Sequence, residues 1–177
     1  MNTDHNPGSA VVESVEHTLR LARTWLTWDG EPRPTADGER IYTPHKVIRR
    51  LGDHIVDHLA EIEALLAGRP TQVDEWGASA ITTDADRVAF TENDLVEAGQ
   101  RLRRLARTFE LRLAAAGPAE WDAPRGDHWT LREIATHLAE SRWYADQLGD
   151  LSRPAGASRA LRVSACVSAA GRRARRC

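Results

Sequence analysis

TPHKVIRRLGDHIVDHLAEIEALL, residues 43–66, has the pattern of one long amphipathic helix. Thr43 is a favourable N-cap, and Pro44 falls at the first helical position, where a missing N–H costs nothing. Gly68 and Pro70 predict the end of the helix, which therefore covers residues 43–67. One apolar stripe repeats with the 3.6-residue period of a helix: Val47, Ile48, Leu51, Ile55, Leu59, Ile62, Leu65 and Leu66.

Two histidines accompany this stripe. His54 and His58 are four residues apart, so their side chains project about one turn from each other on the same face. His137 is the one histidine on the inner side of another predicted helix. Three imidazoles and a water would form the open site of a catalytic zinc ion, with metal–nitrogen distances of about 2.0–2.1 Å. The alternative stays open that the histidine pair is ordinary amphipathic surface.

Three further amphipathic helices are predicted, over residues 10–28, 91–116 and 130–150. The segment 29–40 holds two prolines and two glycines and is expected to be a loop. The longer polar segment 68–90 is predicted to be a crossover or a cover over a site, with Trp76 and Phe90 folding onto the helices. No strand pattern is evident. The sequence thus predicts an all-α four-helix bundle.

The charged residues divide the chain into two parts. Residues 151–177 hold seven arginines and no acid, which leaves 17 basic and 26 acidic residues, a net charge of −9, in residues 1–150. We expect one domain over 1–152 and a disordered, basic tail over 153–177. The acidic body argues against nucleic acid as its ligand. An extension without a partner is favoured for the tail over a tether to nucleic acid or to an anionic surface.

Several classes of protein are excluded by what the sequence lacks. No apolar run is long enough to cross a bilayer and no signal peptide is evident, so a cytoplasmic protein without membrane contact is expected. Cys166 and Cys177 alone cannot build a disulfide framework or a cysteine-based zinc site. No glycine-rich phosphate loop or serine nucleophile elbow is present. Catalytic residues are therefore not assigned.

Other polar residues near the candidate ligands receive weaker assignments. His17 lies off its helical stripe and is predicted to be solvated, and neither His45 nor His128 has a partner at ligand spacing. Carboxylates within one turn of a candidate ligand could orient an imidazole; they are Asp53, Asp57, Glu61 and Glu140. Three arginines are near enough in sequence to contact an anion, although surface salt bridges are the favoured prediction; they are Arg49, Arg50 and Arg142.

Residues 129–148, WTLREIATHLAESRWYADQL, resemble the W-[ST]-x-R-E-I-x-x-H-[LI]-A-[DE]-S motif of the DinB-like (YfiT-like) superfamily. In that family the motif marks a helix that carries a metal-binding histidine, here His137. Residues 42–65 are similar to the other metal-bearing helix, with His54 and His58 in its H-x-x-x-H arrangement. The two segments cover about a quarter of the chain.

The order of the helices departs from the family. There the tryptophan-containing helix normally precedes the two-histidine helix, and here it follows. We interpret the chain as a DinB-like bundle in permuted helix order. An unpermuted alignment would require a second histidine four residues after His137, where Ser141 stands.

The resemblance implies a divalent metal, zinc or nickel, in the bundle core. Some members use a low-molecular-weight thiol such as mycothiol or bacillithiol to transfer to, or isomerise, a small electrophile. The expected function is accordingly that of a metal-dependent thiol transferase or isomerase with a small-molecule substrate, and a homodimer is left open. The alternative is a non-enzymatic helical interaction module with incidental histidines.

Overall fold

The computed structural model describes residues 5–72 and 80–152, which are mostly helical and make the chain all-α. The elements are α1 (Gly8–Ala22), η1 (Arg23–Thr27), β1 (Arg33–Pro34), β2 (Ile41–Tyr42), α2 (Pro44–Leu66), η2 (Asp84–Arg87), α4 (Glu92–Ala116), α5 (Pro118–Trp121), α6 (Leu131–Ala139), η3 (Glu140–Arg142) and α7 (Trp143–Leu148).

Side-chain caps fix the starts of the main helices. The Thr43 hydroxyl accepts a hydrogen bond from the Lys46 N–H at the start of α2, as predicted. Thr91 starts α4 and Thr130 starts α6 with complete capping boxes, in which Asp94 and Glu133 bond back to the threonine N–H. The predicted helices 43–67 and 91–116 are confirmed to within a residue or two at each end.

The other two predicted helices are less regular. The one over 10–28 starts earlier, at Gly8, and its last turns are the 3₁₀ segment η1. The one over 130–150 is a rod of three pieces, α6, η3 and α7, with Ser141 inside the 3₁₀ turn. The short helix α5 was not predicted; Gly117, with φ of +81°, turns the chain after α4 so that Pro118 can start it.

The prediction that the chain has no strand is wrong at one small ribbon. β1 and β2 pair antiparallel, with Arg33 opposite Tyr42 and Pro34 opposite Ile41. The turn between them is closed by the Thr35 N–H, which donates to the Arg40 carbonyl over 2.8 Å, and by Gly38 at φ +76°. Two residues per strand are too few to show an alternating pattern, so sequence periodicity could not reveal them.

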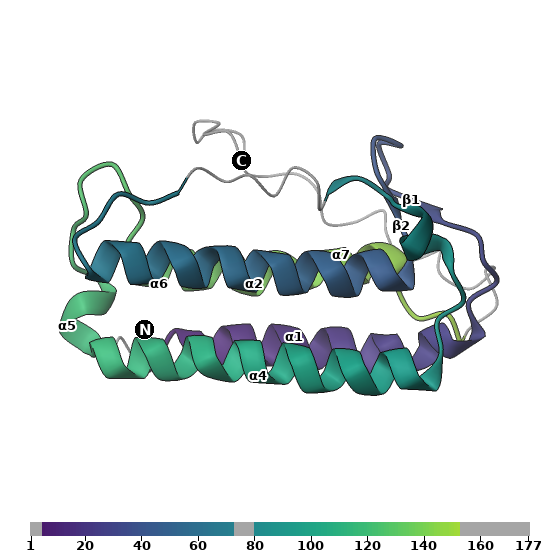
Figure 1. The fold of residues 1–177 in the computed structure, drawn as a ribbon, viewed down its shortest axis with the longest axis horizontal. Helices are drawn as coiled ribbons and strands as arrows, with labels where there is room; N and C mark the ends of the chain where they lie inside the picture. Colours follow the sequence, from purple (N-terminus) through teal and green to yellow (C-terminus); the bar gives the residue numbers. More distant parts are fainter. Residues whose placement is uncertain (1–4, 73–79, 153–177) are drawn as a thin grey trace, which may run out of the picture.

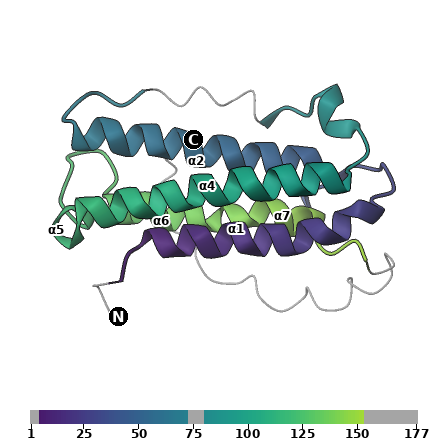
Figure 2. The same ribbon diagram turned by 60° about the horizontal axis from the view of Figure 1, so that its bottom comes forward.

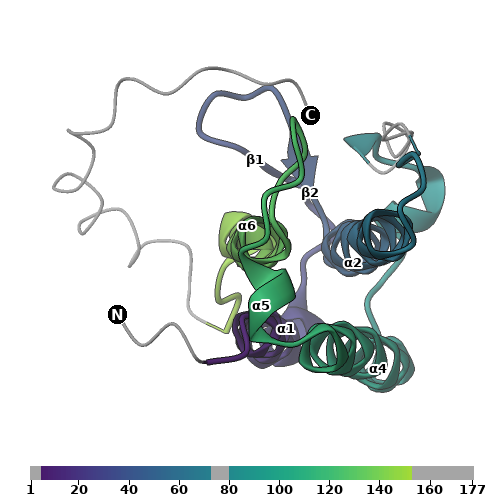
Figure 3. The same ribbon diagram turned by 90° about the vertical axis from the view of Figure 1, so that its left-hand side faces the viewer.

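The long helices lie side by side. α2 runs with the α6–α7 rod in one layer and α1 with α4 in the other (Figure 1), and the end view places α1, α2, α4 and α6 at four corners around a common interior (Figure 3). The turned view shows α4 in front of the α6–α7 rod (Figure 2). The larger apolar cluster between these layers contains Val11, Val15, Leu19, Leu51, Ile55, Ile62, Leu102, Ala106, Phe109, Leu113, Leu131, Ile134, Ala135 and Leu138.

A second cluster closes the end of the molecule near the β-ribbon. It contains Ala22, Trp25, Tyr42, Val47, Phe90, Ala145 and Leu148. Phe90 is buried there, which confirms that this end of segment 68–90 folds onto the helices. Trp76 and the predicted disordered tail over 153–177 lie outside the described residues. In the part of the chain that is described, no helix combines the length and apolar composition needed to span a bilayer.

Candidate metal centre

The side chains of the three predicted ligands meet between helices α2 and α6. His54 and His58 project from one face of α2, and His137 reaches them from α6. The His54 Nε2 atom lies 3.0 Å from His58 Nε2 and 3.1 Å from His137 Nε2. Within the described ranges this is the one group of at least three histidine, cysteine or carboxylate side chains close enough to hold an ion.

Two of the nitrogen–nitrogen separations are close to those expected around a shared metal ion. Nitrogens that share a tetrahedral ion at about 2.0–2.1 Å are about 3.3 Å from one another. The Nε2 separations of 3.0 and 3.1 Å need to widen by only a few tenths of an ångström to reach that value. Three imidazoles leave a fourth coordination position for water or substrate, which is typical of catalytic rather than structural sites.

Burial favours the neutral imidazoles that bind metals. His58 is 7% exposed, while His54 and His137 are partly exposed. Desolvation, with smaller contributions from His58 and His137, lowers the pKa of His54 to about 3. Desolvation and the nearby His58 also lower the pKa of His137, although Glu140 and Glu61 oppose this shift. His54 and His137 thus present uncharged nitrogen lone pairs at neutral pH, as metal ligation requires.

Outer hydrogen bonds set the orientation of two rings. Glu61 Oε2 lies 2.7 Å from His58 Nδ1, so the carboxylate accepts the Nδ1–H and leaves the Nε2 lone pair facing the cluster. Ser141 Oγ lies 2.7 Å from His54 Nδ1, with the Tyr144 hydroxyl at 3.4 Å from the same atom. In both cases the ring nitrogen remote from the cluster is occupied, which directs Nε2 inward.

Of the four carboxylates considered, the structure places Glu61 against a histidine. Asp53 lies 3.9 Å from the Arg49 guanidinium instead, and Glu140 lines a surface groove. The role of Ser141 and Tyr144 was missed because neither is an expected ligand. Ser141 follows His137 by four residues, the same spacing that pairs His54 with His58, and this could have marked it as a neighbour of the cluster.

Aromatic rings also lie beside the cluster. The centroid of the Trp129 ring is 4.9 Å from that of His137 and 6.4 Å from that of His58. The centroid of the Tyr144 ring is 6.0 Å from that of the His54 ring. These rings replace water beside the imidazoles, which strengthens any electrostatic interaction made there.

Three other histidines, His17, His45 and His128, do not join the cluster. The prediction that His17 is simply solvated is incomplete, since its Nε2 lies 2.7 Å from Asp146 Oδ1 on α7. His45 faces the Ala89 carbonyl at 3.4 Å, and His128 is exposed in a turn. The sequence-based separation of these three from the cluster is therefore confirmed.

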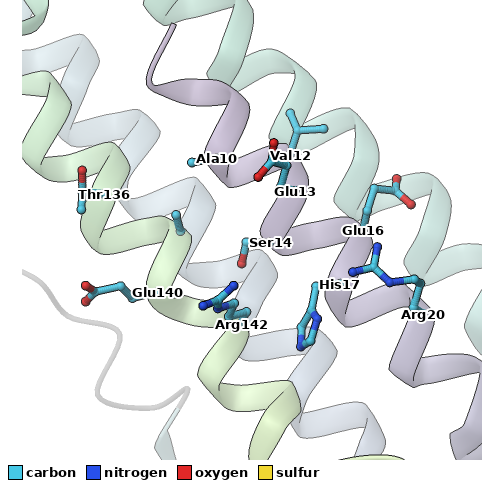
Figure 4. Close-up of a pocket in the computed structure, with 11 residues that line it drawn as sticks. Ala10, Val12, Glu13, Ser14, Glu16, His17, Arg20, Thr136, Glu140 and Arg142 are labelled. Atoms are coloured by element: carbon cyan, nitrogen blue, oxygen red, sulfur yellow. The ribbon is translucent and has the colours of Figure 1, made fainter. Parts of the chain in front are cut away.

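His17 instead lines an open groove of about 640 Å³ between α1 and the α6–α7 rod (Figure 4). The view shows Ser14 and His17 on α1 and Arg142 on the facing α6–α7 rod. Charges of both signs line the groove, including Glu13, Arg20 and Arg142. The Ser14 hydroxyl is buried there without a hydrogen-bond partner.

The arginines near the cluster have different partners. Arg49 makes two hydrogen bonds to Asp86, through Nε at 3.1 Å and Nη2 at 2.7 Å, so it forms a salt bridge, but with a buried carboxylate rather than at the surface as predicted. Arg142 is exposed in the groove. Arg50 makes no salt bridge with any described residue, and its guanidinium carbon lies 4.7 Å from the centroid of the Tyr144 ring.

Comparison with known proteins identifies no relative of this chain. No family model, no curated protein and no solved structure matches it.

Proposed function

We propose that this chain is a metal-dependent enzyme of the DinB-like four-helix-bundle type, in permuted helix order, which acts on a small molecule with the help of a low-molecular-weight thiol. The observation that carries this proposal is the convergence of three imidazoles from two helices. The His54 Nε2 atom lies 3.0 Å from His58 Nε2 and 3.1 Å from His137 Nε2. The tryptophan and histidine motif around His137 supports the family assignment.

His54, His58 and His137 would hold the ion, with Glu61 and Ser141 fixing the rings of His58 and His54. A bound zinc or nickel ion would supply Lewis acidity, which keeps a coordinated thiol in the nucleophilic thiolate form. The chain itself orients the ligands, and the Trp129 ring beside them excludes water from part of the site. Neutral imidazoles leave the net positive charge on the ion, where it can stabilise an anionic sulfur.

The proposal is tested by metal content and thermal unfolding. Full-length protein exposed to excess zinc or nickel and then desalted should retain about one ion per chain, and its melting temperature should fall on addition of chelator. His58→Ala should abolish both effects. His17→Ala, which removes an imidazole that also contacts a carboxylate, is the matched control and should abolish neither.

The pH dependence separates a histidine site from other metal binding. Protons compete with the ion for the ligands, so the melting-temperature gain at pH 7 should shrink by about pH 5. Equal melting temperatures with and without metal at pH 7 would refute the metalloenzyme proposal. The alternative, a helical interaction module with incidental histidines, predicts that result.

A further inference from the structure

Two cations precede the metal cluster along one ridge of α2, which turns by about 40° around the helix axis with each step of four residues. Lys46, Arg50, His54 and His58 follow one another at intervals of four residues, so their side chains form one row along the helix. His54 and His58 belong to the metal cluster. Lys46 and Arg50 do not take part in the metal site.

Lys46 is buried without an anionic partner. It is 2% exposed, and its ammonium donates a hydrogen bond to the neutral Thr82 hydroxyl over 2.8 Å. The same ammonium lies 5.3 Å from the centroid of the Tyr42 ring. Among the described residues it forms no salt bridge with a carboxylate. Desolvation, reinforced by the charge of Arg50, lowers the pKa of Lys46 to about 8, although the charge of Asp86 opposes this shift.

Arg50 is also incompletely satisfied. Its Nη2 has a long contact of 3.4 Å with the Tyr144 hydroxyl, and its Nε and Nη1 atoms are buried without any hydrogen-bond partner. Buried donors are nearly always hydrogen-bonded in folded proteins, so two free N–H-bearing atoms on one guanidinium point to a missing acceptor. The hydroxyl of Tyr42, in the same region, is likewise buried and unpartnered.

The local carboxylates do not supply that acceptor. Asp86 is the buried carboxylate nearby, and Arg49 already holds it through two hydrogen bonds. Asp53 contacts Arg49 as well, at 3.9 Å. Within the described residues, Lys46 and Arg50 therefore make no direct salt bridge with a carboxylate, and Asp86 and Asp53 act on them only through longer-range attraction. A buried charge is tolerated at low cost only when a partner neutralises it.

We propose that Lys46 and Arg50 bind an oxyanion of the substrate, beside the metal ion held by the histidines. The Tyr144 hydroxyl joins the two regions, since it lies 3.4 Å from Arg50 Nη2 and 3.4 Å from His54 Nδ1. Arg50 and His54 are one step apart in the row, about 6 Å along the helix axis. A molecule of a few bonds can thus bridge the cation pair and the ion.

That the bound oxyanion belongs to a substrate rests on the proposed function. Anion binding itself depends only on Lys46 and Arg50. It defines the substrate class as a small thiol or electrophile with a carboxylate, or a similar oxyanion, a few bonds from its reactive atom. Because the free Arg50 atoms are buried, Tyr144 has to turn aside when the oxyanion binds.

The test uses full-length protein loaded with cobalt(II), whose absorption bands report a bound thiolate. 3-Mercaptopropionate, 2-mercaptoethanesulfonate and neutral 2-mercaptoethanol are titrated separately. We expect at least one anionic thiol to bind about tenfold more tightly than the neutral one, the gain from roughly one charge-assisted hydrogen bond. Tighter binding of 3-mercaptopropionate would indicate a site for a planar carboxylate, and tighter binding of 2-mercaptoethanesulfonate a site for a tetrahedral oxyanion. Arg50→Gln and Lys46→Met should each reduce the preference for the anionic thiol without lowering the affinity for 2-mercaptoethanol.

Arg101→Gln is the matched control. Arg101 lies on the exposed face of α4 and pairs with Glu97, so its removal should leave the preference unchanged. Equal affinities for all three thiols in the unmodified protein would overturn the oxyanion site while leaving the metal site intact.

A second measurement needs no metal. In chelator-treated protein at constant ionic strength, propionate or methanesulfonate should raise the melting temperature of the unmodified chain and not that of Arg50→Gln. If cobalt fails to bind but this shift appears, the metal proposal fails and the oxyanion site stands. If the shift is absent from both proteins, the oxyanion site is refuted independently of the metal.

Discussion

Two histidine–carboxylate pairs in this chain have the same contact distance, 2.7 Å, in different surroundings. In the His58–Glu61 pair the carboxylate takes Nδ1, and Nε2 faces two further imidazoles. In the His17–Asp146 pair the carboxylate takes Nε2, and the ring lies in an open groove. The side chains of the first pair are 9% and 24% exposed, and those of the second 31% and 38%.

The difference teaches that a histidine–carboxylate contact alone does not define a metal site. Glu61 becomes an orienting residue because the nitrogen it leaves free points at other ligands. Asp146 instead contacts Nε2 of His17, the nitrogen that corresponds to the inward-facing one of His58. Among the described residues, no other potential metal ligand groups with His17. Burial then adds to the contrast, since it strengthens the interactions of the first pair and solvent screens those of the second.

The largest expected effect concerns the pH dependence of stability in chelator. The pKa of His54 falls from its usual 6.5 to about 3 on folding, mainly through desolvation. Between these values the unfolded chain binds a proton that the native state does not. Stability is therefore full above pH 6.5 and decreases as the pH falls toward 3, by somewhat more than 1 kcal/mol per pH unit.

Urea unfolding at several pH values checks this prediction. Between pH 6.5 and 4 the free energy of unfolding should drop by about 3 kcal/mol from His54 alone, and His54→Gln should remove that part of the slope. Above pH 7.5 the two curves should run parallel, since neither state binds the proton there. Identical slopes for both proteins below pH 6 would show that His54 is not desolvated in the native cluster.

The next effect is on metal affinity. Glu61→Gln removes the charge that accepts the His58 Nδ1–H, and affinity for zinc should fall by about 10–100-fold. Asp146→Asn makes the same chemical change at the same distance from His17 and should leave affinity unaltered. Competition with a chromophoric chelator measures both. A comparable loss in the two variants would contradict the distinction drawn between the pairs.

A smaller effect is expected at Ser141. Ser141→Ala removes a neutral hydrogen bond to His54 Nδ1 and should lower metal-free stability by about 0.5–1.5 kcal/mol. It should also change the tautomer balance of His54, which ¹⁵N chemical shifts of the ring report. Ser9→Ala, which removes a part-buried contact with Glu110, should alter stability without moving the His54 signals. Unchanged His54 shifts in Ser141→Ala would exclude a positioning role for the serine.

The sequence predicted the parts of this molecule that depend on local periodicity. The stripe of residues 43–66 located α2, and the caps at Thr91 and Thr130 located two more helix starts. The choice of His54, His58 and His137 depended on helical spacing and on an inward-facing position, and the three rings do meet.

Features set by contacts between distant segments could not be predicted in this way. Tyr144 approaches His54 from 90 residues away, and Asp146 approaches His17 from 129 residues away. The break of the last helix at Ser141 and the unpartnered state of Arg50 likewise depend on tertiary packing. Helical periodicity states which face a residue occupies but not which side chain of another helix meets it.

The smallest expected effect is the coupling energy of the His17–Asp146 pair. Both side chains are about one third exposed, so solvent and salt screen their interaction even at 2.7 Å. A double-mutant cycle with His17→Ala and Asp146→Ala should give about 0.2–1 kcal/mol at low salt and less at 0.5 M NaCl. Urea unfolding of the four proteins at pH 7 measures it. A coupling above about 2 kcal/mol that persists in salt would mean that the pair is shielded from solvent, and the contrast with His58–Glu61 would then rest on the orientation of the rings alone.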